Sequence, residues 1–180
     1  MSLEQLTEAW VAPFENGRHL MRTRDWLLEL DPSASEALRI AALTHDVERN
    51  FPDGPVRPAN LPANDRKYRD AHQARSAELV TTWLTEHGAS PAMIQNVAGL
   101  VLVHEWGGTP EADLLQGADS ISFLETTVPH AGKWIHDGRY SRERTEEQLR
   151  WMLDRIRLQQ ARQLALPFDD AAVSGLESGS

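Results

Sequence analysis

An imidazole and a carboxylate stand side by side at the end of an apolar stretch, in the segment "LRIAALTHDVERNFPDGP". His45 and Asp46 follow residues that read as a buried helix. Imidazole nitrogen and carboxylate oxygen are common metal ligands. Because a buried carboxylate without a partner costs several kcal/mol, buried polar groups are normally paired or bind a metal. We therefore expect residues from elsewhere in the chain to share a site with this pair.

Other segments with helical periodicity also place a His or an Asp among apolar residues. Positions three, four or seven apart lie on one face of a helix. The polar residues with apolar neighbours at such spacings are His19, His45, His72, His104 and Asp119. Together with Asp46 they supply four imidazoles and two carboxylates. This set suits one or two divalent transition-metal ions (Mn, Fe, Co, Ni or Zn) better than calcium or magnesium alone.

The elements that must position these residues are helices, because strand signals are almost absent. The expected helices span residues 3–12, 17–30, 32–47, 65–87, 91–104, 111–126 and 145–165. Asp31 is the expected N-cap of the third helix, with Pro32 at its first position. Pro167 is expected to stop the last helix. The sequence thus predicts one all-α domain, a helical bundle over residues 1–168, followed by a loose tail at 169–180.

Composition limits the classes of function. The chain has 180 residues, a formal net charge of -9 and no cysteine. An acidic chain does not suit sequence-independent binding of a nucleic acid polymer, and the missing thiols exclude disulfides and thiolate metal sites. No signal peptide and no membrane span is evident, so a cytoplasmic location is expected. The sequence leaves the oligomeric state open.

The ordered pattern resembles the HD phosphohydrolase superfamily. The hallmark of that family is a His on one helix, a His-Asp pair on the next and a distant Asp, here His19, His45-Asp46 and Asp119. The segments "AHQARSAELV" around His72 and "VLVHEWGG" around His104 resemble those that add two histidines in binuclear members. The resemblance covers roughly residues 16–125 and implies an all-α bundle of the HD type. It also implies hydrolysis of a small phosphorylated substrate.

Several residues have two interpretations. Arg22, in "RHLMR", could bind a substrate phosphate as a bidentate donor or could pair with an acid such as Asp46 or Glu48. Glu48 could orient or deprotonate a water, or could be a solvated surface residue. Lys133 could reach the pocket or lie at the surface. Glu105 could belong to the site or be a loop carboxylate. Trp106 could line the mouth of the substrate pocket or belong to the core. His130 and His136 are expected at the surface.

The expected mechanism is hydrolysis by metal-activated water, since a bound divalent ion lowers the pKa of its water toward neutrality. Asp46 would bridge the ions, and the proline-rich loop at residues 51–62 would wall the pocket. Two other functions remain open. A di-iron oxygenase of the HD fold would share these ligands, and a binding module would hold a metal or nucleotide without turnover.

Overall fold

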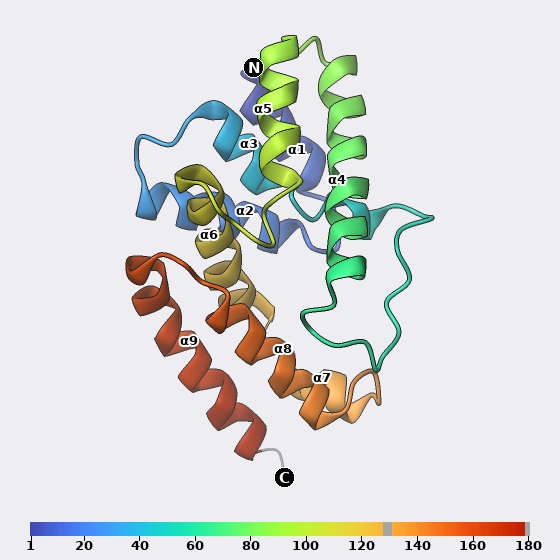
Figure 1. The fold of residues 1–180 in the computed structure, drawn as a ribbon, viewed down its shortest axis with the longest axis vertical. Helices are drawn as coiled ribbons and strands as arrows, with labels where there is room; N and C mark the ends of the chain where they lie inside the picture. The colour runs from blue at the N-terminus through green and yellow to red at the C-terminus, as the bar shows by residue number, and fades with distance from the viewer. Residues whose placement is uncertain (128–130, 179–180) are drawn as a thin grey trace.

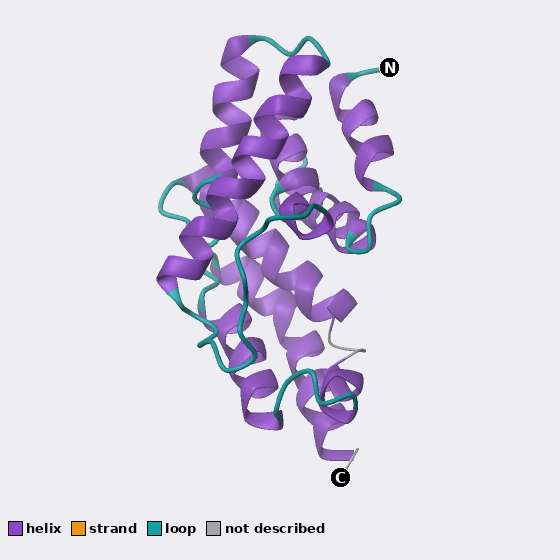
Figure 2. Cartoon of the chain, turned by 90° about the vertical axis from the view of Figure 1, so that its right-hand side faces the viewer, coloured by secondary structure: helices purple, strands orange, loops and turns teal. Residues whose placement is uncertain are grey.

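Helices are the only regular secondary structure in the part of the chain that the structure describes, residues 1–127 and 131–178 (Figure 2). The computed structural model therefore confirms the all-α class. Within those residues the elements are α1 (Leu3–Val11), α2 (Gly17–Leu30), α3 (Glu36–Thr44), η1 (Val47–Asn50, a 3-10 turn), α4 (Arg66–Glu86), α5 (Pro91–Val101), α6 (Pro110–Thr127), α7 (Ala131–His136), α8 (Arg142–Asp154) and α9 (Gln159–Ser178).

Short polar side chains begin most of these helices. The side-chain oxygens of Ser2, Asp65, Ser90 and Ser141 each accept a hydrogen bond from the backbone N–H three residues later. Such N-caps satisfy a donor that has no partner within the helix. Ser2 also forms a capping box with Gln5. Local chemistry therefore sets where these helices start.

The chain changes conformation between His45 and Asp46. His45 is the C-cap of α3 and keeps helical dihedrals, whereas Asp46 has φ -114° and ψ 20° and precedes η1. The expected helix through Val47 therefore ends at Thr44. The break turns two consecutive side chains in different directions, and this separates the two halves of the site described below.

Helix α6 lies between two apolar clusters. Residues of α2 to α5 pack on the first half of α6 through Leu115, while α8 and α9 pack on its second half through Ile121 and Leu124. Asp119 lies between these halves and is 5% exposed. The helix that carries the distant carboxylate is thus buried on both sides, which fixes that carboxylate in the middle of the molecule.

A long loop connects the two ends of the bundle. Residues 51–65 run from η1 toward α7 and α8 before α4 begins (Figure 1). Arg57 donates a hydrogen bond to the side chain of Gln148 in α8, and the Ala63 backbone N–H donates to Glu147 over 3.0 Å. The proline-rich segment is therefore attached to the C-terminal helices.

The expected start of the third helix was wrong. The Asp31 carboxylate accepts hydrogen bonds from the backbone and hydroxyl of Ser33, and the Asp31 N–H donates to Leu27, which makes Asp31 the C-cap of α2. Ser35 caps α3 instead, through the N–H of Leu38. Both residues are good N-caps, and the local turn at residues 31–33 decides between them.

The expected single last helix is two helices, α8 and α9. The break follows Arg155, whose buried guanidinium binds acids of α6 and of the segment after α5, and no Gly or Pro in the sequence marks it. Pro167 does not end α9, which continues to Ser178. Phe168 packs on Trp26 with ring centroids 5.9 Å apart, and such packing offsets the hydrogen bond that a proline removes. The expected loose tail is therefore helical over residues 169–178.

The short helix α7 was not predicted from the sequence. It follows residues 128–130, so His130 lies outside the described residues, and His136 is the last residue of α7. None of the helices in the described residues combines the length and apolar character needed to cross a bilayer.

Candidate metal centre

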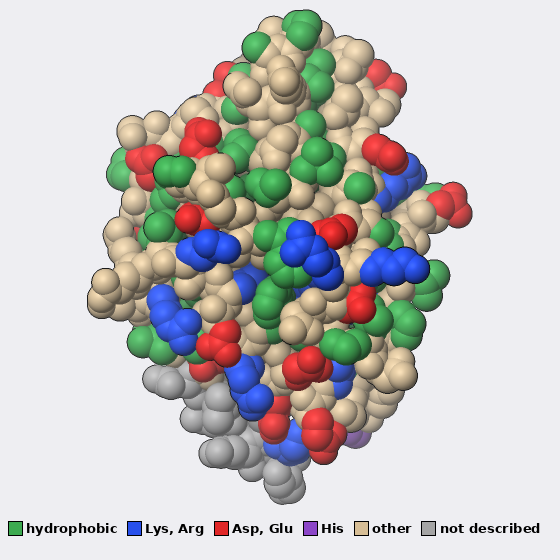
Figure 3. All heavy atoms as spheres, viewed as in Figure 1, with side chains coloured by type: hydrophobic (Ala, Val, Ile, Leu, Met, Phe, Trp, Pro, Cys, Tyr) green, Lys and Arg blue, Asp and Glu red, His purple; other side chains and the backbone are tan. Residues whose placement is uncertain are grey.

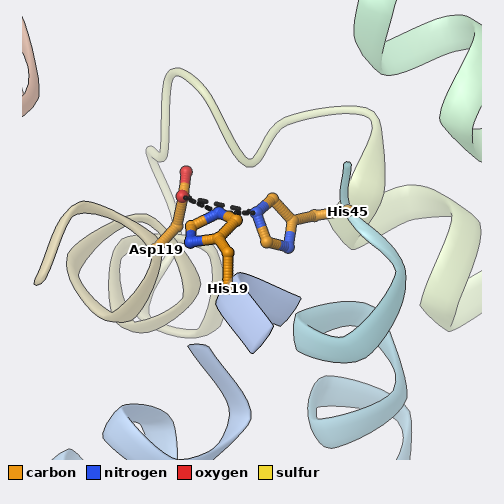
Figure 4. Close-up of side chains that lie close together, drawn as sticks. All are labelled: His19, His45 and Asp119. Atoms are coloured by element: carbon orange, nitrogen blue, oxygen red, sulfur yellow. Dashed lines mark hydrogen bonds and ion pairs between the residues drawn. The ribbon is translucent and has the colours of Figure 1, made fainter. Parts of the chain in front are cut away.

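One imidazole of α2, one at the end of α3 and the carboxylate of α6 meet in the interior (Figure 4). The Nε2 atoms of His19 and His45 lie 3.2 and 3.3 Å from Oδ1 of Asp119, and 3.3 Å from each other. All three residues are buried. Their ligand atoms lie within 4.8 Å of one another, so the three side chains could hold one metal ion.

A second group lies next to the first. Asp46 Oδ1 is 2.6 Å from Nε2 of His72 in α4 and 3.8 Å from Nε2 of His104. His104 stands in the turn that follows α5, three residues beyond its last residue. The rings of His45 and His104 are 5.0 Å apart, which joins the two groups into one site. All six residues that the sequence indicated as ligands are thus brought together.

Every imidazole in the site is oriented through its Nδ1 atom. Nδ1 donates to the Ala42 carbonyl in His45, to the Val101 carbonyl in His104 and to Glu48 in His72, over 2.7 to 2.9 Å. His19 Nδ1 is 2.9 Å from Ser122 Oγ, and because that hydroxyl donates to the His19 carbonyl, it accepts from Nδ1. Each Nε2 is therefore left to accept, as in metal-binding histidines.

The Nε2 atom of His104 is buried without a hydrogen-bond partner among the described residues, and that of His72 faces only the Asp46 carboxylate, 2.6 Å away. An unsatisfied buried acceptor is costly. A cation between Nε2 and the carboxylate would satisfy both, so the donor set fits a metal ion.

In this site, positively charged imidazole and guanidinium groups lie between ionised carboxylates. Burial alone would lower the pKa of His45, but the Asp119 carboxylate raises the pKa to about 9. Burial and the neighbouring imidazoles His45 and His72 lower the pKa of His104 to about 4. Burial would raise the pKa of Asp119, yet Arg155 and His45 hold the pKa well below its usual range. In the metal-free protein, protons on some imidazoles take the place that metal ions would occupy.

Glu105 forms part of the wall of the site, where the loop interpretation would have left it exposed. The residue is 2% exposed and forms ion pairs with the guanidinium groups of Arg69 and Arg155. Burial opposes ionisation, but these two arginines lower the pKa of Glu105 to about 2. Its Oε1 lies 4.0 and 3.9 Å from Nε2 of His72 and His104. Arg155 also binds Asp119 and so connects Glu105 to the first group of ligands.

The site opens into a cavity of about 1050 Å³. Its wall includes Asp46 and Asp119 of the site and Phe51, Pro55 and Ala59 of the long loop, so this loop does wall the cavity. The lining also contains the cations Arg18, Arg49, Arg57, Arg69, Lys133, Arg139, Arg144 and Arg155. The same lining contains six acids, Glu15, Asp46, Glu48, Glu105, Asp119 and Asp137. On the face of the molecule drawn in Figure 3, Lys and Arg side chains are likewise interspersed with Asp and Glu side chains over the middle and lower parts. The cavity therefore has a small excess of cations within a chain of net charge -9, and this excess favours anions locally.

A family model described as "Domain of unknown function (DUF4202)" matches residues 7–171, a range that contains all six ligand residues and the cavity lining. The chain belongs to the DUF4202 family. Searches of curated proteins and of solved structures found no match.

Arg22 of this DUF4202 chain pairs with an acid, as in the second of its two interpretations, but the acid is Glu125 and not Asp46 or Glu48. Its guanidinium forms a two-point ion pair with Glu125, at 2.8 and 3.0 Å, and lies over Trp26. It is absent from the described lining of the cavity. The spacing His19–Arg22 could not reveal this, because the partner is about a hundred residues away in sequence.

For Glu48 and Trp106, the structure also decides between the two interpretations. The Glu48 carboxylate is buried and accepts from His72, so it positions a ligand and is not a solvated surface residue. Trp106 donates from its indole nitrogen to Asp70 and packs on Trp151, outside the described cavity lining. Lys133 does line the cavity.

The residues that sequence analysis missed are mostly arginines. The sequence analysis assigned no site role to Arg49, Arg57, Arg69, Arg144 and Arg155, yet all five line the cavity. One signal was available, since Arg57 lies in the proline-rich loop already expected to wall the pocket.

Proposed function

We propose that this DUF4202 chain is a metal-dependent hydrolase of the HD type that cleaves a small phosphoester such as a nucleotide. The observation that carries the proposal is the convergence of four Nε2 atoms and two carboxylates at one wall of a cation-lined cavity. The order of the ligands along the chain, His19, His45-Asp46 and Asp119, is the basis of the resemblance to the HD superfamily.

The residues fit one or two divalent transition-metal ions. His19, His45 and Asp119 would hold one ion, and Asp46, His72 and His104 the other. Neutral imidazole suits Mn, Fe, Co, Ni or Zn, and carboxylate oxygen adds negative charge. Bound ions of this kind supply a water of lowered pKa and neutralise charge on phosphoryl oxygens.

The chain's own groups prepare the site for an anion. Glu48 fixes the His72 ring, and Ser122 fixes the His19 ring, so that Nε2 faces the site in each. Arg155 holds the Asp119 carboxylate ionised and in place. Arg49 pairs with Asp46 over 2.9 Å and also lines the cavity, where its charge attracts a phosphoryl group.

The cation-lined cavity favours phosphoester hydrolysis over the other two functions. A di-iron oxygenase needs the same ligands but has no need for an excess of cations in the lining. A site retired from turnover would be free to lose a ligand, whereas both ligand groups here are complete. Arginine and lysine are the usual protein groups that bind phosphate.

The direct test is metal analysis of protein purified without chelator, followed by turnover assays on a panel of nucleotides and other phosphoesters. We expect up to two ions per chain and release of phosphate from at least one class of substrate. His45→Ala and Asp46→Ala should lose metal and reduce turnover by at least about a hundredfold. His87→Ala is a control, because His87 caps α4 through the Trp83 carbonyl, outside both ligand groups.

A metal-free protein after purification and reconstitution, or full turnover in Asp46→Ala, would refute this proposal. Oxygen uptake by an iron-loaded protein without any phosphate release would assign the site to oxidation instead.

A further inference from the structure

The cavity contains a second group of cations that the metal centre does not use. The guanidinium groups of Arg57, Arg69 and Arg144 all donate to one atom, Oε1 of Gln148 in α8. Arg69 and Arg144 do so at 3.5 and 3.4 Å, which are long for hydrogen bonds. Three positive groups thus converge on one neutral acceptor.

Two of these cations, Arg57 and Arg144, have less compensation than other arginines of the chain, whereas Arg69 is paired with Glu105. Arg155 binds two buried carboxylates, and Arg22 binds both oxygens of Glu125. Among the described residues, no carboxylate lies within ion-pair distance of Arg57, which instead has the rings of Tyr68 and Tyr140 at 5.5 and 5.9 Å. Like charges held together in a partly dry cavity repel one another unless an anion joins them.

Arg144 has too few acceptors for the N–H groups of its side chain. Its side chain is 8% exposed, and both Nε and Nη1 are buried without a hydrogen-bond partner among the described residues. Its closest acid, Glu147, is 3.6 Å away, is 44% exposed and already accepts from Ala63. A buried guanidinium with two unused donors costs stability unless a ligand accepts from them.

The titration behaviour of the arginines agrees with this geometry. Burial and the charges of Arg49 and Arg69 lower the pKa of Arg57 to about 10. Burial lowers the pKa of Arg144 as well, and the positive charge of Arg69 lowers it further. For both groups, burial and neighbouring arginines outweigh the nearby groups that would raise the pKa, which include Glu147 beside Arg144.

From these contacts we infer that Arg57, Arg144 and Gln148 form a subsite for a second phosphoryl group of the substrate, apart from the phosphoryl group at the metal centre. Arginine presents paired donors that match phosphate oxygens, and Gln148 would add its amide N–H group. Arg69 joins the two places, because it binds both Glu105 beside the metal ligands and Gln148 in the subsite. The substrate class is therefore a compound with two phosphoryl groups, and this assignment rests on the proposed function.

The subsite also gives the long loop a role. Arg57 comes from residues 51–65, while Arg144 and Gln148 come from α8, so a bound phosphoryl group would join the loop to the C-terminal helices. Tyr140 lies beside Arg57 and Arg144, with its ring 5.9 and 6.0 Å from the two guanidinium carbons.

The first test measures binding of inorganic phosphate by calorimetry to the full chain in the presence of chelator, which removes any contribution of metal. We expect saturable binding, and a dissociation constant raised about tenfold in Arg57→Gln and in Arg144→Gln. Arg66→Gln should leave the constant unchanged, since Arg66 is 75% exposed and lies over Trp106 outside the cavity lining. Because Arg144→Gln could loosen α8, both variants are first checked for cooperative melting in phosphate-free buffer.

The second test compares two ligands on the metal-loaded chain, a nucleoside bisphosphate or diphosphate and the matching monophosphate. Wild type should bind the compound with two phosphoryl groups at least about tenfold more tightly, and Arg57→Gln should remove most of that preference. No preference in wild type, or folded Arg57→Gln and Arg144→Gln variants that bind phosphate as wild type does, would overturn the inference.

The two proposals fail separately. Phosphate binding that depends on Arg57 in a chain without metal or turnover would refute only the proposed hydrolase. Metal-dependent turnover with phosphate binding unaffected by Arg57→Gln and Arg144→Gln would refute only the subsite.

Discussion

At the scale of single residues, the site depends on groups that hold its ligands. An imidazole can offer either nitrogen, and the partner of one nitrogen selects which atom faces the metal. Here Ala42, Val101, Glu48 and Ser122 take the Nδ1 protons of the four histidines. Two of these partners are backbone carbonyls, so side-chain substitution can test only Glu48 and Ser122.

Ser122→Ala should weaken metal binding at the His19 group about 10- to 100-fold, because the His19 ring loses the acceptor that fixes its tautomer. Competitive titration with a metal-sensitive dye measures the change. Thr44→Val is the matched control, since that buried hydroxyl donates only to the Ile40 carbonyl within α3. Equal metal affinity in wild type and Ser122→Ala would show that Ser122 does not orient the ligand.

Glu125 provides a pH-dependent contribution to stability away from the metal ligands. Burial would raise its pKa, but hydrogen bonds from Arg22 and Trp26 lower the pKa in the folded chain. A lowered folded pKa means that the contribution is complete above the ordinary glutamate pKa of about 4.3 and is lost as the pH falls below it. Glu125→Gln should therefore reduce the free energy of unfolding by about 1 kcal/mol at pH 7 and by less at pH 3.

Urea denaturation at the two pH values measures this difference. Glu29→Gln, on an exposed position of the same helix as Arg22, should change stability little at either pH. A loss from Glu125→Gln that stays the same from pH 7 to pH 3 would contradict the ion-pair explanation.

At the scale of elements, α6 must approach its neighbours closely in order to bring Asp119 to the site. Gly117, two residues earlier, faces α9, and a Cβ atom built there would lie 2.8 Å from Cβ of Ala161. Two helices can approach this far only where a side chain is absent. This glycine therefore controls the contact between the metal-ligand helix and the C-terminal helices.

Gly117→Ala should destabilise the fold by about 1–3 kcal/mol, because the added methyl group overpacks the contact between α6 and α9. Gly99→Ala is the matched control within a helix, since no atom lies within 4 Å of a Cβ built there. That change should stabilise α5 by up to about 1 kcal/mol. Thermal melting of both variants measures the effects, and a stabilised Gly117→Ala would rule out the close approach.

At the scale of the whole molecule, the candidate metal centre joins segments far apart in the chain. Its ligands come from α2, the end of α3, α4, the turn after α5 and α6. An ion that binds the folded chain and not the unfolded one stabilises the fold in proportion to the logarithm of its free concentration. The proposed ions would therefore act as cross-links through the middle of the bundle.

Addition of a divalent transition metal at about 100 times its Kd should raise Tm by roughly 5–10 °C, and chelator should reverse the shift. His72→Ala should reduce the shift by removing one ligand group, while His87→Ala should keep it. Differential scanning calorimetry measures both. A Tm of wild type that ignores metal and chelator alike would contradict binding at these six residues.

The local sequence determined much of this protein. Helical periodicity was enough to predict the all-α class and the bounds of α2. Gly88, which has φ 72°, and Ser90-Pro91 marked the end of α4 and the start of α5. The six candidate ligands were also readable, because a His or an Asp among apolar residues of a helix needs a partner, and the structure brings all six together. These features depend on neighbours within a few residues.

Tertiary structure decided the rest. The division of the ligands into two groups depends on the backbone break between His45 and Asp46, and the pairing of Arg22 with Glu125 depends on how α2 packs on α6. The convergence of Arg57 and Arg144 on Gln148 needs the long loop to reach α8. Electrostatic and hydrogen-bond partners are set by distance in space, and local sequence patterns do not show which distant residues become neighbours.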